Sequence, residues 1–541
     1  MFLPNVISPQ VLPLRPPKGP PCVDRLADPW FGSCIPLNRI TDPKAGAGGL
    51  ARQKRETGST GAKTMIGTQQ IDDNLRLAVL AAALIAVATT GAILANKFSL
   101  GLAVAAVAAI IIFTFSFVSQ EIALYILLFS MLLGPQFVAE SEAVAFYRGR
   151  GVSLRFDDFL IAVIGTAWIL KVTINKDFGI FLRTPLNRPI ALYLLACAVA
   201  TLNGYLTNPR VNATVATFYI LKYFEYFVVY FMAVNHLREK EQIRRFVITM
   251  LVVCFLICLY GIYQIPSGVR VSAPFEGAEG EPNTLGGYLV MMLSLVIGLL
   301  VTKGSFRNKL PLFALMPFML VTLAATQSRG SWLALGPMLL TLIVLSRRRL
   351  LIIVPLCLLL AASPLILPKS VINRALYTFN QPEEEGQLKV GNVKIDTSTS
   401  ARLESWRLIM TQDFVQRPLL GYGITGYSFV DAQIPMILTN TGVVGLIAFF
   451  FLIGMLFRTS IRVYRTSCDP LYSGLALGHL GAIVGLLVHG IGANTFIIVR
   501  IMEPFWFLTA LVVMSPEIEA RVMAVGTSLN GSGGEGILPR G

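Results

Sequence analysis

The chain has 541 residues, of which 54% are apolar and only 14% are charged, and its formal net charge is +15. Apolar windows of about 17–25 residues recur along most of its length, which is the length that crosses the hydrocarbon core of a bilayer. These windows exclude an ordinary soluble enzyme. The basic residues lie mostly in short loops between the windows, so the positive charge indicates membrane topology and not nucleic-acid binding.

We therefore expect an all-α polytopic membrane protein with about 12–14 transmembrane helices. Residues 1–74 differ from this pattern, because they are rich in Pro and Gly and contain no apolar run long enough to span. Such a segment cannot bury a core, and we predict a disordered, basic N-terminal tail. Two explanations of the tail remain open: translation starts at Met65, or the tail is cytoplasmic and contacts anionic lipid head groups.

Transmembrane helices 1–11 are expected within residues 75–367 and helices 12–14 within residues 433–514. Residues 515–541 are expected to form a disordered cytoplasmic tail. The expected spans are Leu77–Ala95, Ser99–Val118, Ile122–Val138, Phe159–Ile174, Pro189–Leu206, Ala213–Ala233, Phe246–Ile265, Leu285–Val301, Leu310–Ala325, Trp332–Leu345, Leu350–Leu367, Ile434–Phe457, Gly474–Ile491 and Ile497–Val513.

The distribution of Lys and Arg predicts the orientation of these spans. Five alternate loops are basic, and they lie at 171–188, 238–245, 303–309, 347–349 and 458–465. Both termini are therefore expected in the cytoplasm, and residues 368–432 are expected outside it. This stretch is the only long polar segment between hydrophobic segments, and a loop of that length inside a compact fold is usually functional.

Two motifs near the outer side carry arginines that topology does not explain. Arg270 precedes Asn283, which follows Pro282 as an expected helix N-cap, and a helix N-terminus beside an arginine makes an anion site. The alternative is a capped loop with a solvated arginine. Arg329 lies at membrane depth near the outer interface, where a charge is costly and indicates function. The alternative is that Arg329 snorkels to lipid phosphate.

The long loop contributes Arg402 and Trp406, which share one face of a helix because they are four residues apart. A guanidinium binds phosphate through two parallel hydrogen bonds, and an indole face suits a sugar ring. The alternative is a surface helix packed on the bundle. In the same loop, Gly421 and Gly423 allow a tight backbone turn near a ligand.

Two further side chains are candidates for proton transfer. Asp431 directly precedes a span and could act as general base for a sugar hydroxyl, or it could cap the helix. His489 is the histidine best placed for chemistry on the outer side, and the alternative is a packed polar residue. Arg500 and Glu503 are expected to form a pair within the membrane.

The sequence contains no P-loop, dinucleotide fingerprint or metal-ligand cluster, which weakens the case for ATP-driven transport. There is also no DxD-like pair of carboxylates on the outer side. We therefore expect a mechanism without metal and without cofactor.

Five pieces of the chain, in this order around one large outward loop, resemble the O-antigen ligase/polymerase superfamily. They are RVSAPFEGAEGEPNTLGGYLV, TQSRGSWLAL, SARLESW, PLLGYG and VDAQIPMILTNTGVVGLIAFFF. The resemblance implies the fold of the membrane-embedded, metal-independent glycosyltransferases (C type) of the bacterial inner membrane. It also implies a donor glycan on undecaprenyl diphosphate, with the diphosphate held by Arg270 and Arg402 and supported by Arg329.

The chain departs from the ligases of this family at one position. The ligase Gly-x-x-Gly pattern aligns on Gly442 and Gly445, which puts Asp431-Ala432 where a His-Asn pair would stand. The departure favours an inverting polymerase of lipid-linked repeat units, with Asp431 or His489 as base. A ligase that transfers glycan to lipid A-core or protein is the second hypothesis, and a transporter or flippase of lipid-linked sugars is the third. Expected partners are membrane lipids, a chain-length regulator and a flippase.

Overall fold

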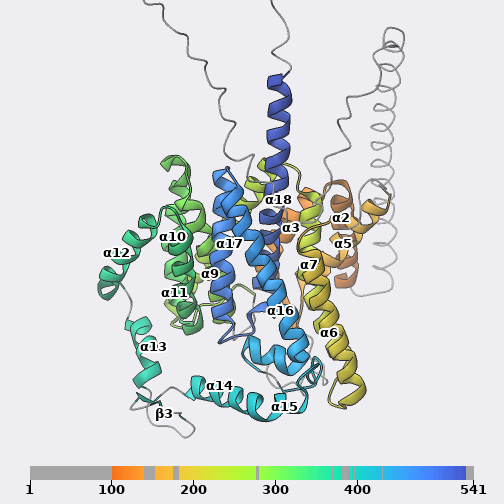
Figure 1. Cartoon of the computed structure of the whole chain (residues 1–541), viewed down its shortest axis with the longest axis vertical. Helices are drawn as coiled ribbons and strands as arrows, with labels where there is room; N and C mark the ends of the chain where they lie inside the picture. Colours follow the sequence, from red (N-terminus) through yellow and green to blue (C-terminus); the bar gives the residue numbers. More distant parts are fainter. Residues whose placement is uncertain are drawn as a thin grey trace, which may run out of the picture.

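The computed structural model describes residues 100–138, 153–174, 182–275, 280–366, 369–380, 387, 389–390, 393–394, 397–428 and 430–531. In these residues most of the chain is helical. Long helices pack side by side into one bundle, and shorter helices form an arc across one end of it (Figure 1). The predicted N-terminal tail and the predicted span Leu77–Ala95 lie outside the described residues.

Before the arc, the described part of the chain forms helices and two short strands. They are α2 (Leu100–Val118), α3 (Gln120–Leu133), β1 (Gln136–Val138), β2 (Ser153–Arg155), α5 (Phe156–Ile174), α6 (Asn187–Thr207), α7 (Ala213–His236), α8 (Lys240–Gln264), η2 (Ile265–Ser267), α9 (Pro282–Val301), α10 (Phe306–Ala325), α11 (Arg329–Leu345) and α12 (Leu350–Ile366). Strands β1 and β2 form an antiparallel pair.

The arc consists of α13, α14, η3 and α15, and the chain then returns to the bundle. The bounds are α13 (Lys369–Asn380), β3 (Lys389–Val390), β4 (Val393–Lys394), α14 (Thr397–Leu408), the π-helical turn η3 (Ile409–Asp413), α15 (Phe414–Gln416), α16 (Gln433–Thr466), α17 (Pro470–His489), η4 (Thr495–Ile497) and α18 (Val499–Gly531). We call the end of the bundle that faces the arc the arc end. The C-terminal part of α18 lies at the opposite end (Figure 1).

Eight of the described helices are long and apolar enough to cross a membrane, and further apolar helices, including α3, α11 and α12, are shorter. Every predicted span within the described residues coincides with a helix, which confirms an all-α polytopic membrane protein. The third predicted span is shorter than expected, because the Gly134-Pro135 step ends α3 and residues 136–138 form β1.

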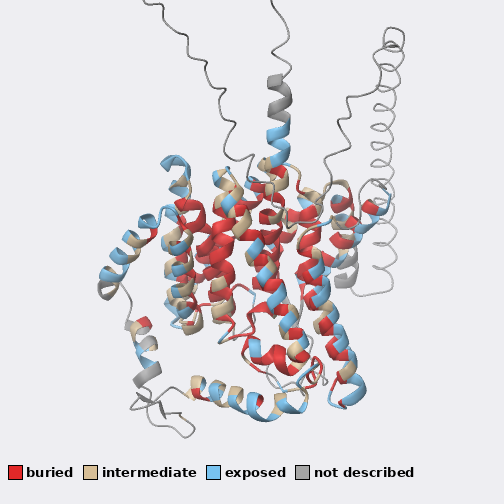
Figure 2. Ribbon diagram, in the orientation of Figure 1, coloured by how far each residue is buried: buried red, intermediate tan, exposed pale blue. Residues whose placement is uncertain are grey.

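Helices α9 and α17 form the buried axis of the bundle. All residues from Thr284 to Val301 of α9 are buried. Figure 2 shows that buried residues fill the interior of the bundle. A Cβ built on Gly298 would lie 2.5 Å from the backbone nitrogen of Gly478, so the two helix backbones touch. The Ser294 hydroxyl donates to the Gly478 carbonyl at 2.6 Å. Small residues and such hydrogen bonds are what lets membrane helices approach closely.

Helix α16 is interrupted, whereas a continuous span over Ile434–Phe457 was predicted. Gly442 has φ +63°, and the backbone groups freed by the break bind the loop that precedes the helix. Tyr422 N donates to the Thr439 carbonyl at 2.7 Å, and Val443 N donates to the Pro418 carbonyl at 2.9 Å. The break is tolerated because these contacts satisfy polar groups that lipid could not.

The two glycines of the GYG sequence serve packing in this structure. Gly421 and Gly423 have φ +63° and +83°, which favours glycine. A Cβ on Gly421 would lie 2.5 Å from the Thr439 carbonyl oxygen, and a Cβ on Gly204 would lie 2.6 Å from the Tyr422 carbonyl oxygen. The glycines therefore allow the loop to lie directly against α6 and α16.

The predicted disordered tail at 515–541 is wrong for its first part, because α18 continues through Gly531. The Ile518 side chain is fully buried. Glu519 accepts hydrogen bonds from the backbone nitrogens of Cys468 and Asp469, both at 2.9 Å. These contacts hold the helix beyond the bilayer length. Residues 532–541 lie outside the described part of the chain.

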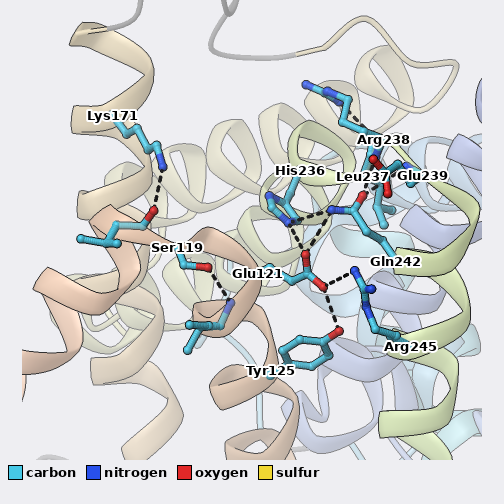
Figure 3. Close-up of polar contacts among 12 residues, drawn as sticks. Ser119, Glu121, Tyr125, Lys171, His236, Leu237, Arg238, Glu239, Gln242 and Arg245 are labelled. Carbon is cyan, nitrogen blue, oxygen red and sulfur yellow. Dashed lines mark hydrogen bonds and ion pairs between the residues drawn. The ribbon is translucent and has the colours of Figure 1, made fainter. Parts of the chain in front are cut away.

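A polar network joins α3, α7 and α8 away from the arc (Figure 3). The Glu121 carboxylate accepts from Tyr125 Oη at 3.0 Å, from Arg245 Nη2 at 2.8 Å and from Gln242 Nε2 at 3.3 Å. His236 Nε2 lies 3.8 Å from the same carboxylate. The network fixes three helices at the end where the positive-inside pattern expects cytoplasm.

We predict that Gly421→Ala destabilises the protein, because the new Cβ overlaps the Thr439 carbonyl and the φ of +63° strains an alanine. The expected loss is about 1–3 kcal/mol of unfolding free energy. Thermal unfolding of the detergent-purified protein measures it. Gly454→Ala is the matched control, because a Cβ there meets nothing within 4 Å. Equal unfolding temperatures for the two variants would contradict this account of the GYG sequence.

Candidate functional site

The N-terminal ends of α9 and α11 meet at the arc end. Ser328 caps α11 and donates from its hydroxyl to Asn283 Oδ1 at 2.8 Å. Ser331 Oγ lies 2.8 Å from Ser328 Oγ. A Cβ on Gly286 would lie 2.2 Å from Ser331 Oγ, so a glycine at this position allows the two helices to lie close together. The predicted N-cap role of Asn283 is wrong, because Glu281 precedes the helix and the Asn283 side chain bonds to α11 instead. Two positive helix ends therefore lie side by side.

His489 ends α17 directly beside these two helices. Its imidazole is 1% exposed, and Nδ1 lies 2.7 Å from the Thr495 hydroxyl. The ring also hydrogen-bonds with the backbone of Asn283. A Cβ on Gly287 would lie 3.0 Å from His489 Cε1, so the ring packs against the bare backbone of α9. The structure thus brings His489 and Asn283 together, as partners within one packed cluster.

Asp431 pairs with Arg402 and does not cap a helix. Arg402 Nη2 lies 3.0 Å from Asp431 Oδ2, and both side chains are 30% exposed. Arg402 also donates to Ser398 Oγ at 3.0 Å, while its buried Nε has no hydrogen-bond partner within the described residues. The N-cap of α16 is Ala432. The ion pair joins α14 of the arc to the start of α16.

A set of hydrogen bonds fastens the segment of Asp431 to the segment that follows His489. Asn494 Nδ2 donates to the Val430 carbonyl at 2.7 Å, and Gln433 N donates to the Gly490 carbonyl at 2.9 Å. Phe496 N donates to Gln433 Oε1 at 2.9 Å. Asp431 is consequently close enough to His489 to act on it electrostatically. The two sequence-predicted bases therefore belong to one site.

Three guanidinium groups gather at the same end of the bundle. Arg270 donates from Nε to the Thr326 carbonyl at 3.1 Å, which places it against the turn before α11. Burial lowers the pKa of Arg270, and the neighbouring charges of Arg374 and Arg329 lower it further. Arg329 is the first residue of α11. Three like charges and two helix N-termini in one half-buried place attract an anion.

Sequence reasoning missed Arg374, which lies on α13 of the arc. Its buried Nε has no hydrogen-bond partner in the described part of the chain, and its guanidinium lies 5.9 Å from the centre of the Tyr377 ring. The signal available in the sequence was KSVINRALYTFN, an amphipathic stretch inside the polar loop. Trp406 lies half-buried on α14 with Arg402, as predicted, and its sugar-binding role stays a prediction.

Part of the chain matches a known family model. Residues 313–438 match the model of the O-antigen ligase family, from α10 through the arc into the start of α16. The match supports the resemblance to the O-antigen ligase/polymerase superfamily, and it indicates ligase- or polymerase-type activity. No curated protein matches the chain.

A buried arginine outside the matched residues, Arg500, holds two loops of the bundle together. Arg500 is 2% exposed, and its guanidinium donates to the Pro274 carbonyl at 2.7 Å and to the Leu132 carbonyl at 3.4 Å. It also donates to the carbonyls of Gly134 and Phe275. A pair with Glu503 was predicted, and the structure instead shows Arg500 holding the loop that carries Arg270.

We predict that Arg500→Met loosens this loop, because four carbonyls lose a charged donor while the side chain keeps its length. The expected loss of unfolding free energy is about 2–4 kcal/mol. Arg521→Met, in the exposed part of the same helix, is the control and should change little. Thermal unfolding together with hydrogen exchange of residues 270–275 measures both effects. Unchanged exchange in Arg500→Met would mean that the guanidinium does not hold the loop.

Proposed function

We propose that the protein polymerises glycan repeat units linked to undecaprenyl diphosphate, at the outer face of a bacterial inner membrane. One observation carries the proposal: the arginines of α11, α13 and the loop before α9 gather at the arc end, which also carries the Arg402–Asp431 pair. These groups lie in, or directly against, the residues that match the O-antigen ligase family. Both termini would be cytoplasmic and the arc extracytoplasmic, as the Lys and Arg distribution expects.

The donor diphosphate would bind between Arg270, Arg329 and Arg374. A guanidinium can donate two parallel hydrogen bonds to phosphate oxygens, and a helix N-terminus adds its positive end. Arg374 has an unsatisfied buried Nε, which is an orphaned donor that a ligand oxygen would satisfy. The fixed cations would take the role that a divalent metal has in other glycosyltransferases. The polyprenyl tail would lie in the lipid beside the bundle.

Asp431 fits the role of general base better than His489. The imidazole of His489 is fully packed, and it already hydrogen-bonds with Thr495 and with the Asn283 backbone. Asp431 is partly exposed, and its carboxylate contacts Arg402 of the arc at 3.0 Å. His489 would then act by positioning, because it fixes the start of α9 beside the segment of Asp431.

Binding of the donor would break the ion pair between Arg402 and the proposed base, Asp431. The diphosphate competes with Asp431 for Arg402, whose Nε is already without a partner. When Arg402 turns to the phosphate, Asp431 Oδ2 loses its hydrogen bond and becomes available to a hydroxyl. The carboxylate of Asp431 would therefore be released from its ion pair only when a donor occupies the site.

The proposed reaction needs no cofactor. The acceptor hydroxyl oxygen bonds to the anomeric carbon of the donor sugar while the bond from that carbon to the phosphate oxygen breaks. Asp431 takes the hydroxyl proton and later releases it to water, and undecaprenyl diphosphate leaves as the anion. Attack from the face opposite the leaving group inverts the anomeric carbon. The arginines stabilise the charge that grows on the diphosphate, a contribution that usually dominates such steps.

The second candidate is a ligase that transfers a finished glycan to lipid A-core or to a protein. The description of the matching family, O-antigen ligase, favours it. The same donor site and base would serve both reactions, and only the acceptor differs. A chain-length regulator and a flippase would be partners of the polymerase.

We predict that Arg402→Ala and Asp431→Ala each abolish polymer while the protein stays in the membrane. The expected loss of rate is about 100-fold or more, the effect of removing one transition-state group. Arg407→Ala is the control, since this arginine lies on the same helix with 74% exposure. The lipid-linked glycan in a deletion strain that carries each variant is the measurement.

The glycan that accumulates separates the hypotheses. Single repeat units on undecaprenyl diphosphate at the outer face support the polymerase. Long undecaprenyl-linked chains would indicate a ligase instead. Units trapped on the cytoplasmic face would indicate a transporter. Polymer of normal length in the Arg402→Ala variant would show that the proposed site is not the active site.

We also predict that Arg374→Ala weakens binding of polyprenyl diphosphate about 10-fold, which corresponds to the loss of one charge-assisted hydrogen bond. Binding of the purified protein to a fluorescent polyprenyl diphosphate at two salt concentrations measures it. The salt dependence should become shallower in the variant, because one fewer cation meets the ligand. Unchanged affinity and salt dependence would remove α13 from the donor site.

A further inference from the structure

The end of the bundle opposite the arc carries basic side chains that the proposed reaction does not use. Lys303 follows the end of α9, and Arg307 lies in the first turn of α10. Arg347 and Arg349 lie in the turn between α11 and α12. All four residues are exposed, and we call them the basic surface. The Lys and Arg distribution predicts that this end faces the cytoplasm.

Two further cations hold these segments together. Arg348 Nη1 donates to the Thr302 carbonyl at 3.3 Å. Lys309 Nζ donates to the same carbonyl and, at 2.7 Å, to the Leu300 carbonyl. These carbonyls lie at the C-terminal end of α9, where unpaired acceptors and the negative end of the helix dipole favour cations. Each residue of the basic surface is within two positions of Thr302, Arg348 or Lys309, so these bonds gather the basic surface at one place.

The basic surface has no counter-charge nearby in the chain. The sequence contains no Asp or Glu between Pro282 and Pro382. In the described part of the chain, none of the four side chains makes a hydrogen bond or an ion pair. Other cations at this end do have partners: Arg245 lies 2.8 Å from Glu121, and Lys240 pairs with Asp469. Topology explains which end the cations occupy, but it does not explain why this group lacks carboxylates.

Exposed apolar side chains border the basic surface on two helices. At the start of α10, Phe306 is 69% exposed, and Leu310 is exposed one turn further along. At the start of α12, Leu350 is 67% exposed, and Val354 is exposed one turn further along. Residues four apart share one face of a helix. Cations directly beside a lipid-facing apolar surface lie at the depth where a phospholipid head group joins its acyl chains.

We propose that the basic surface binds the head group of an anionic phospholipid in the adjacent leaflet. The guanidinium and ammonium groups donate charge-assisted hydrogen bonds to the phosphate oxygens. The acyl chains lie against the exposed faces of α10 and α12, and this contact favours a lipid over a soluble anion. The site and the proposed donor site lie at opposite ends of the bundle, so neither assignment depends on the other.

Lipid binding to the purified full-length protein tests the proposal. Native mass spectrometry gives dissociation constants for phosphatidylglycerol, which is anionic, and for phosphatidylcholine with the same acyl chains, which is zwitterionic. The wild type should bind phosphatidylglycerol about 10-fold more tightly. The double variant Arg347→Gln/Arg349→Gln should lose about 10-fold in affinity for phosphatidylglycerol, and its affinity for phosphatidylcholine should stay unchanged.

A matched control separates a local site from the total charge. Arg244→Gln/Arg521→Gln removes the same number of exposed cations from this end, but each of these arginines has a carboxylate partner. This control should bind phosphatidylglycerol as the wild type does. Lys303→Gln/Arg307→Gln is a second test variant, with the same expected loss, in case the first one fails to fold.

Three results would overturn the proposal. The first is a wild type that binds the two lipids equally, and the second is an equal loss of affinity in the control and the test variants. The third is displacement of phosphatidylglycerol by millimolar inorganic phosphate, which would indicate a site for a soluble anion. Since polymer formation is not measured here, failure of the proposed function would leave this result standing.

Discussion

The structure depends on the direct backbone contact between α9 and α17. Gly298 and Gly478 leave no side chain between the two helices, and the buried hydroxyl of Ser294 crosses the same interface. In lipid there is little hydrophobic gain from packing apolar helices together, so close approach and hydrogen bonding supply the stability. Because the axis is rigid, the two ends that it presents at the arc end, Asn283 and His489, have a fixed relation to each other.

The segments that carry the candidate site residues at the arc end are linked to Asn283 and His489 by hydrogen bonds. Thr495 and the Asn283 backbone hold His489, and the residues after His489 hold the segment of Asp431 through hydrogen bonds from Asn494 and Phe496. Arg402 therefore has a defined position, although the arc that carries it is a long polar loop. A site built on helix ends keeps its geometry better than one carried by a loop alone.

Charged side chains are arranged differently at the arc end and inside the bundle. At the arc end, Arg270 lies near the like charges of Arg329 and Arg374, and together they give a positive field that attracts an anion. Inside the bundle, Arg155 pairs with Asp157, and Lys222 pairs with Asp158 and Glu225. The difference follows from water: a half-buried site can exchange its counter-ions with a ligand, whereas a fully buried one has to be neutral by itself.

The sequence by itself determined the described spans, the class of protein and the resemblance to the O-antigen ligase/polymerase superfamily, because hydrocarbon thickness and short motifs are local properties. It also pointed to Arg270, Arg329 and Arg402, since arginines on the outer side are not explained by topology. The tertiary structure decided which of these groups meet, that Asn283 bonds to α11 instead of capping α9, that Arg374 joins the arginines, and that α16 breaks at Gly442. Those outcomes depend on contacts between residues far apart in the chain, and no local pattern of residues records which distant partner satisfies a buried polar group.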